Sequence, residues 1–117
     1  MSNMQDLLDG YHRFCESYFT EDNPLQKKLS RAQHPKILVI ACSDSRVDPA
    51  IILQASPGDL FIVRNVANIV PPMYKPQSSQ HGVSAAIEFA VKQLSIRHIL
   101  VLGHSHCGGI RALLNEE

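Results

Sequence analysis

The fold is decided by the stretch Ile37-Leu-Val-Ile-Ala-Cys-Ser-Asp-Ser-Arg46. Its first five residues form a short, unbroken apolar run, which predicts a strand over 37–41 that is buried on both faces. A polar loop follows at once, and Asp48-Pro49 then has the form of a helix N-cap and first helical residue. A buried strand that leads directly into a short helix, here to about Gln54, is typical of an α/β domain.

The same alternation continues along the chain. Two further apolar runs predict strands over Leu60–Val63, which we expect to be buried, and His98–Leu102. Between them, residues 65–80 contain three prolines and predict an irregular surface segment, and a helical period runs from about Ser79 to Leu94. A last helix begins near Ile110. We therefore expect an α/β fold with a mostly parallel open sheet flanked by helices.

An N-terminal helical arm, about residues 3–32, precedes the first strand. Apolar residues between Met4 and Phe19 recur at steps of three and four, so they form one stripe on a helix. Asn23-Pro24 predicts the start of a second helix that continues to about Ala32.

Composition excludes several classes of protein. The 117 residues include 11 basic and 11 acidic side chains, so the formal net charge is zero, which argues against a general nucleic-acid-binding protein. The longest apolar runs fall far short of the roughly 20 residues that span a bilayer. Residues 1–6 do not resemble a signal peptide, so we expect a cytoplasmic protein. The chain has three cysteines, and this odd number favours metal binding or catalysis over a disulfide scaffold.

Metal-ligand residue types follow two of the predicted strands. Cys42 and Asp44 come after the first strand, and His104 and Cys107 come after the third. If these strands are neighbours, two thiolates, one imidazole and one carboxylate converge at the carboxyl end of the sheet. This donor set suits Zn²⁺. A structural zinc site is the alternative, whereas an anion-binding thiol loop is disfavoured because only three residues separate Cys42 from Arg46.

Several linked motifs resemble the β-class carbonic anhydrases. The resemblance is carried by Ala41–Val47 and Gly103–Gly109, by the connecting stretch Gly58–Pro72, and by the shorter segments Ala85–Phe89 and Asp9–Phe14. It covers essentially the whole chain. The implied activity is the reversible hydration of CO₂ to bicarbonate and a proton by zinc-bound hydroxide, in a cytoplasmic homodimer or higher homo-oligomer with a role in carbon utilization.

The resemblance also implies roles for individual residues. Cys42, His104 and Cys107 would hold Zn²⁺, and Asp44 and Arg46 would form the catalytic dyad. In a closed state, Asp44 would instead be the fourth zinc ligand. Val39 stands where bicarbonate-regulated members have tryptophan, which favours an open site. The implied substrate-binding residues are Gln33, Phe61, Val66, Phe89 and Gly108. Of these, Gln33 matches a family glutamine that acts across a dimer interface.

The family usually continues well beyond residue 117. The resemblance therefore implies a single, incomplete domain over 1–117 that lacks the C-terminal strands and helices of the family. Two alternatives to an active lyase stay open. One is a truncated, inactive zinc-binding or interaction protein, and the other is a hydrolase of CS₂ or COS with the same zinc site. Two further residues keep two interpretations each: Arg64 lies on the family motif and has either a site role or a structural ion pair, and His106 is either a solvated loop residue or a proton relay.

Overall fold

The structure is a computed structural model that describes residues 2–73 and 82–115. The chain divides into two compact units, residues 1–33 and 34–117, and each is described by itself. The expectation of one incomplete domain with a helical arm over about 3–32 stays a prediction.

The first unit contains helices α1 (Met4–Tyr18) and α2 (Pro24–Leu29). Asn3 caps α1 by accepting a hydrogen bond from the backbone N–H of Asp6 at 2.9 Å. No residue of α1 is buried, so its apolar stripe is exposed.

Helix α2 begins as predicted, with Asn23 as N-cap and Pro24 as the first helical residue. It ends at Leu29, so the prediction of a helix to about Ala32 was too long. The Ser30 hydroxyl donates to the carbonyl of Lys27 at 2.7 Å and closes the last turn.

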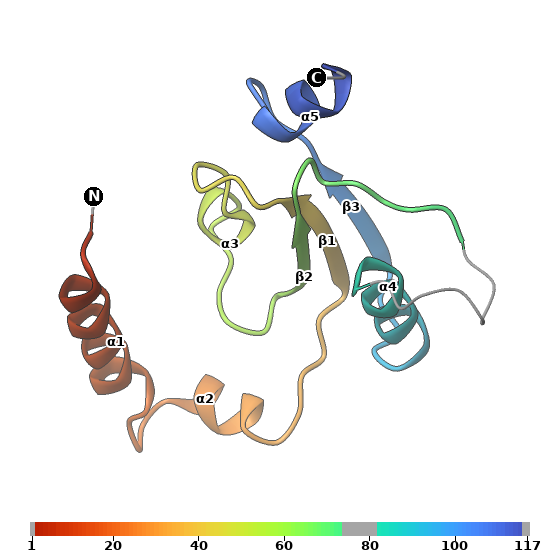
Figure 1. Cartoon of the computed structure of the whole chain (residues 1–117). Helices are drawn as coiled ribbons and strands as arrows, with labels where there is room; N and C mark the ends of the chain where they lie inside the picture. Colours follow the sequence, from red (N-terminus) through yellow and green to blue (C-terminus); the bar gives the residue numbers. More distant parts are fainter. Residues whose placement is uncertain (1, 74–81, 116–117) are drawn as a thin grey trace. The chain divides into compact units, whose positions relative to one another are not determined.

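The second unit is built on a parallel sheet of three strands: β1 (Ile37–Cys42), β2 (Leu60–Asn65) and β3 (His98–Leu102). Strand β1 lies in the middle and pairs in parallel with both neighbours (Figure 1). The expected α/β class and mostly parallel sheet are confirmed, and the adjacency of β1 and β3 brings the two metal-ligand segments together.

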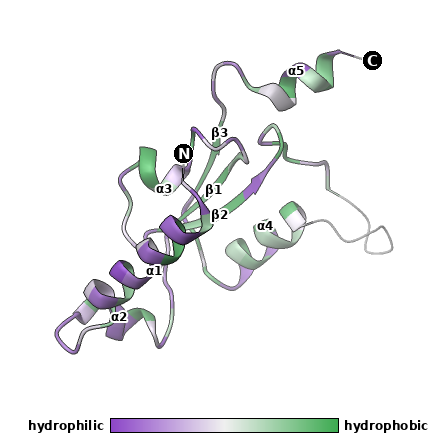
Figure 2. Ribbon diagram, turned by 60° about the vertical axis from the view of Figure 1, so that its left-hand side comes forward, coloured by the Kyte–Doolittle hydropathy of each residue, from purple (hydrophilic) through white to green (hydrophobic). Residues whose placement is uncertain are grey.

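The three strands differ in burial. In β1, all residues after Ile37 are buried. Leu60–Val63 was expected to be a buried strand, but β2 is only partly buried because it has a paired neighbour on one side. Strand β3 is largely exposed, with Ile99 and Val101 each half accessible, although Figure 2 colours much of the sheet as hydrophobic.

Helices α3 (Pro49–Ile52), α4 (Gly82–Lys92) and α5 (Gly108–Leu114) complete the second unit. Helix α4 packs on the sheet through Ala90, which forms a buried cluster with Leu38 and Ile40 of β1. The expected start of α4 near Ser79 lies outside the described residues.

The predicted ends of these helices differ by up to two residues from the observed ones. Helix α3 stops before Gln54, which has a left-handed backbone (φ 51°). Helix α4 ends two residues before Leu94, and α5 begins two residues before Ile110. Among residues 2–73 and 82–115, no helix combines the length and the apolar character needed to cross a bilayer.

Candidate metal centre

Three side chains with metal-ligand atoms meet at the carboxyl ends of β1 and β3. Cys42 is the last residue of β1, and His104 and Cys107 lie in the loop between β3 and α5. One ligand atom from each lies within 4.8 Å of the others, although the segments are 62 residues apart in sequence. The predicted convergence of Cys42, His104 and Cys107 is therefore seen in the structure.

The orientation of His104 leaves one ring nitrogen available for a metal. Its Nδ1 lies 2.9 Å from the Ser105 carbonyl oxygen, which places the ring proton on Nδ1 as the donor. Nε2 then carries the lone pair, and this atom is buried without a hydrogen-bond partner. A buried polar atom without a partner is costly, and a metal ion would satisfy it.

The two cysteine sulfurs are spaced as zinc would require. Their Sγ atoms are 3.8 Å apart, and both side chains are buried. Two thiolates that each lie about 2.3 Å from a tetrahedral zinc ion are about 3.8 Å from one another. The sulfur spacing, the unpartnered imidazole nitrogen and the two-sulfur, one-nitrogen donor set all fit Zn²⁺.

The neighbourhood of Cys42 favours the thiolate. The adjacent His104 ring, the backbone N–H groups of Asp44 and Ala67 and the Cys107 thiol lower the pKa of Cys42 to about 6, although burial opposes this shift. The same proximity raises the pKa of His104 above its ordinary value. A thiolate is the form of cysteine that binds a metal, so Cys42 is prepared for this role near neutral pH.

Asp44 and Arg46 form a bidentate ion pair beside these ligands. The Arg46 side chain donates from Nε to Oδ1 at 2.9 Å and from Nη2 to Oδ2 at 2.6 Å. The Arg46 backbone N–H adds a third bond to Oδ1 at 2.9 Å. These contacts hold the pKa of Asp44 well below its ordinary value. Asp44 Oδ2 lies 3.9 Å from His104 Nε2, so the carboxylate stands at the edge of the ligand cluster.

Arg64, on the neighbouring strand β2, fixes the loop that carries Asp44. Its guanidinium donates to the Cys42 carbonyl at 2.8 Å and to the Asp44 carbonyl at 2.7 Å. Its ion pair with Asp48 is longer, at 3.6 Å. The expected ion pair is present, but the shorter contacts link Arg64 to the main chain of the loop that carries Asp44.

Two predicted pocket residues lie together but away from the metal ligands. Phe61 of β2 and Phe89 of α4 stack with ring centroids 5.6 Å apart. Phe61 pairs with Leu38, four residues before Cys42 on β1. At about 3.3 Å per residue, this is roughly 13 Å along the strand. Their assignment to a CO₂ pocket stays a prediction.

The other predicted site residues have different positions. Val66 lies beside the start of α5, because its Cγ1 atom approaches Gly109, and Gly108 is the first residue of that helix. Gln33 belongs to the first unit, so no contact between it and the metal centre is described. The roles of all three stay predictions.

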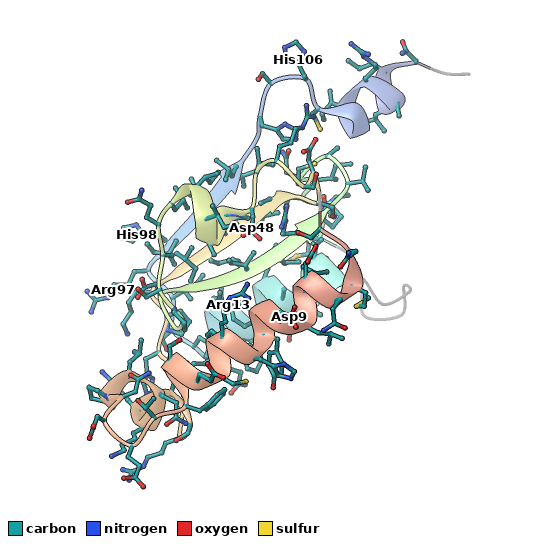
Figure 3. All side chains as sticks on the ribbon, turned by 90° about the vertical axis from the view of Figure 1, so that its left-hand side faces the viewer. Asp9, Arg13, Asp48, Arg97, His98 and His106 are labelled. Atoms are coloured by element: carbon teal, nitrogen blue, oxygen red, sulfur yellow. The ribbon has the colours of Figure 1, made fainter. Side chains whose placement is uncertain are left out.

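His106 is exposed in the loop before α5, and its side chain points outward (Figure 3). Its carbonyl oxygen accepts a bond from Arg46 Nη2 at 3.2 Å. The main chain of His106 therefore helps to hold the Asp44–Arg46 pair, and this bond joins the two loops of the site.

Comparison with known proteins identifies the family. A family model described as carbonic anhydrase matches residues 37–117, which include all three candidate ligands. A carbonic anhydrase of Synechocystis sp. is 49% identical over 111 residues. The solved β-carbonic anhydrase CcaA has 49% sequence identity and a TM-score of 0.85 over 97% of this chain. The chain belongs to the β-carbonic anhydrase family.

The family resemblance extends over only part of each relative. This β-carbonic anhydrase chain spans 39% of the Synechocystis sequence and 53% of the CcaA chain. A third relative, one of two β-carbonic anhydrases from Sordaria macrospora described as tetrameric, is 38% identical with a TM-score of 0.80, and the match covers 56% of that chain. The chain therefore spans about two fifths to just over half of the length of these relatives.

The sequence motifs did not reveal how this β-carbonic anhydrase chain supports its candidate metal ligands. The contacts of Arg64 with two carbonyls and of His104 with the Ser105 carbonyl were not foreseen. The close approach of Gly109 to the turn at Ala67 was also missed. For Gly109, the Gly-Gly pair after Cys107 was the available signal, since paired glycines often mark close backbone contact.

Proposed function

We propose that this chain holds Zn²⁺ through Cys42, His104 and Cys107 and catalyses CO₂ + H₂O ⇌ HCO₃⁻ + H⁺. The observation that carries the proposal is the cluster itself. Two sulfurs and an unpartnered imidazole nitrogen lie within 4.8 Å of one another, next to a carboxylate held by arginine. Membership of the β-carbonic anhydrase family supports the same reaction.

The metal would supply the nucleophile. Zn²⁺ with three protein ligands keeps a fourth position for water and lowers the pKa of that water towards neutrality. Cys42 at the end of β1, and His104 and Cys107 in the loop between β3 and α5, would hold this metal.

Asp44 would orient the attacking oxygen. As a carboxylate it can only accept hydrogen bonds, so Asp44 would accept the hydrogen of the attacking oxygen and leave a lone pair of that oxygen free for the CO₂ carbon. Because Arg46 occupies both carboxylate oxygens and keeps the pKa of Asp44 low, Asp44 stays charged across the physiological pH range. The two hydrogen bonds from Arg46 support an open site, in which Asp44 acts beside the metal and is not a fourth ligand.

The substrate requires an apolar wall next to this oxygen. Val66 lies beside the loop that carries Cys107 and is two-thirds exposed, so its side chain is available to contact CO₂. We assign Phe61, Phe89, Gly108 and Gln33 to substrate binding on the family resemblance, with Gln33 reaching the site from a second copy of the chain.

We also propose that the chain works as a homodimer or a larger homo-oligomer. The apolar stripe of α1 is exposed, and so are apolar side chains of β3. The tetrameric relatives from Sordaria macrospora support assembly of identical subunits. Analytical ultracentrifugation would test this, and a monomer at micromolar concentration would contradict it. A cytoplasmic location and a role in carbon utilization stay predictions from the sequence.

Stopped-flow measurement of CO₂ hydration tests the enzymatic proposal. Zinc-loaded protein should accelerate hydration, and the Cys42→Ser variant should not. Equal rates for the two proteins, with zinc bound stoichiometrically to the wild type, would contradict the proposal and favour an inactive zinc-binding protein. Hydrolysis of COS or CS₂ without CO₂ hydration would favour the alternative of a CS₂ or COS hydrolase with the same zinc site.

A further inference from the structure

A turn formed by Val66, Ala67 and Asn68, here called the 66–68 turn, packs against the loop that carries Cys107 and against the start of α5. Ala67 is buried and forms one cluster with Cys42 and Cys107. Ala67 and Asn68 both have left-handed backbones, with φ of 74° and 46°. This conformation is costly for residues other than glycine, so the surroundings must hold the turn in place.

Gly109, the second residue of α5, makes the contact possible. A Cβ atom on this residue would lie 2.6 Å from Val66 Cγ1, 2.9 Å from the backbone nitrogen of Ala67 and 3.0 Å from Ala67 Cβ. A flexible side-chain end can move away from such an atom, but a backbone nitrogen cannot. The 66–68 turn therefore reaches the start of α5 only because residue 109 has no side chain.

The neighbouring glycines do not share this constraint. A Cβ on Gly108 would have no heavy atom within 4 Å, and one on Gly103 would meet only the Asn68 side chain, at 3.9 Å. Gly103, Gly108 and Gly109 are all outside the left-handed region, so alanine would add bulk without backbone strain. The difference between the three positions is therefore one of packing alone.

We propose that Gly109 is a positioning residue of the metal centre. Cys107 is the N-cap of α5 and lies two residues before Gly109, so a displacement of the first turn of the helix is transmitted to its sulfur. The packing of Gly109 on the 66–68 turn thereby holds the Cys107 Sγ atom 3.8 Å from the Cys42 Sγ atom. This inference rests on the proposed function only in that the centre binds a metal.

The size of the clash predicts a measurable effect. Ordinary contacts between carbon atoms lie at about 3.5–4.0 Å, so a methyl group at residue 109 would force a movement of about 1 Å. Metal–ligand distances tolerate deviations of only about 0.2 Å. Changes in the residues that support metal ligands weaken binding by about 10- to 100-fold, and we expect a loss of that size.

The test compares Gly109→Ala with Gly103→Ala in the full chain. Zinc affinity is measured by competition with a chromophoric chelator, and the sulfur-to-metal absorption bands are recorded with Co²⁺ in place of zinc. Gly109→Ala should bind zinc about 10- to 100-fold more weakly than the wild type and shift the Co²⁺ bands. Gly103→Ala should match the wild type in both measurements, because a Cβ there meets only the Asn68 side chain at 3.9 Å.

Two results would overturn the inference. One is an unchanged zinc affinity and Co²⁺ spectrum in Gly109→Ala, with only the melting temperature of the metal-free protein lowered, which is the signature of packing alone. The other is an equal loss of affinity in Gly103→Ala. Neither depends on CO₂ hydration, so failure of the enzymatic proposal remains separate.

A second variant covers the case in which Gly109→Ala does not fold. The double variant Val66→Ala/Gly109→Ala removes the shortest contact, at 2.6 Å, and leaves those to the backbone nitrogen and Cβ of Ala67. It should fold but still bind zinc more weakly than the wild type. Wild-type affinity in this variant would contradict the positioning role.

Discussion

Arg46 holds both oxygens of the Asp44 carboxylate, with Nε 2.9 Å from Oδ1 and Nη2 2.6 Å from Oδ2. Two parallel hydrogen bonds of this kind fix the plane of a carboxylate as well as its charge. Asp44 is thus presented to the metal centre in one orientation. The carboxylate is also directed towards His104, whose Nε2 lies 3.9 Å from Oδ2.

The variant Asp44→Asn should keep zinc and lose most of the rate. The amide preserves the shape of the side chain, but its NH₂ group donates where the carboxylate accepts. We expect a fall of at least about 100-fold in kcat, in the range typical for loss of a group that directs a proton. Metal analysis and stopped-flow CO₂ hydration of the same sample check this. An unchanged rate would remove Asp44 from the mechanism.

The variant Arg46→Met should raise the pKa of Asp44 towards its ordinary value of about 4. In the wild type, Arg46 depresses this pKa, so the stability that the pair contributes is present above about pH 4 and is lost as pH falls towards the folded pKa. The difference in melting temperature between wild type and variant should therefore shrink below about pH 4. A difference that is constant from pH 7 to pH 3 would show that the pair does not act through this carboxylate.

The thiol of Cys42 should titrate near pH 6 in the metal-free protein, because its neighbours lower its pKa to about 6. The difference in thiolate absorbance between wild type and Cys42→Ser isolates this step. His104→Ala removes the largest cause, so the midpoint should move up towards about 8.5. Zinc binding competes with this proton, so affinity should fall as pH drops below about 6. A midpoint unaffected by His104→Ala would contradict the assigned cause.

The variant Arg64→Met should destabilise the protein by about 2 kcal/mol, because hydrogen bonds from a charged group contribute about 1.5–3 kcal/mol. It leaves the carbonyls of Cys42 and Asp44 without their donor. Lys92→Met is the matched control, since its ion pair with Glu88 is exposed and should contribute less than about 1 kcal/mol. Urea unfolding of both variants decides the matter, and equal losses would refute the role of Arg64.

The rate of CO₂ hydration should rise towards alkaline pH. In the proposed site, the thiolates of Cys42 and Cys107 would together neutralise the charge of Zn²⁺, so the metal would acidify a water molecule less than a site with three imidazoles would. A pH–rate profile that is flat from mildly acidic to alkaline conditions would contradict the two-thiolate ligand set.

The middle strand and the ligand positions could be predicted from sequence because their signals are local. An unbroken apolar run identified β1, and metal-ligand types at the ends of two strands identified Cys42, His104 and Cys107. Burial of β2 and β3 was harder to predict, since it depends on which strand occupies the centre of the sheet.

The contacts that hold the site in place could not be predicted, because they too depend on which segments lie side by side in the fold. Arg64 contacts the loop that carries Asp44 from a neighbouring strand. The proposed role of Gly109 depends on a turn some 40 residues earlier in the sequence. Neither contact leaves a periodic pattern in the sequence. The helix ends were wrong by a few residues because local bonds, such as that of Ser30, end a helix without changing its apolar period.

If the proposed site binds zinc, the pairing of β1 with β3 would couple metal supply to folding. An unfolded chain keeps His104 and Cys107 near each other but separates both from Cys42, so it offers zinc an incomplete set of ligands. Bound zinc would then stabilise the native state by mass action, by about 1.4 kcal/mol for each tenfold rise in free zinc above Kd. The lifetime of the folded chain should therefore follow the zinc concentration around it.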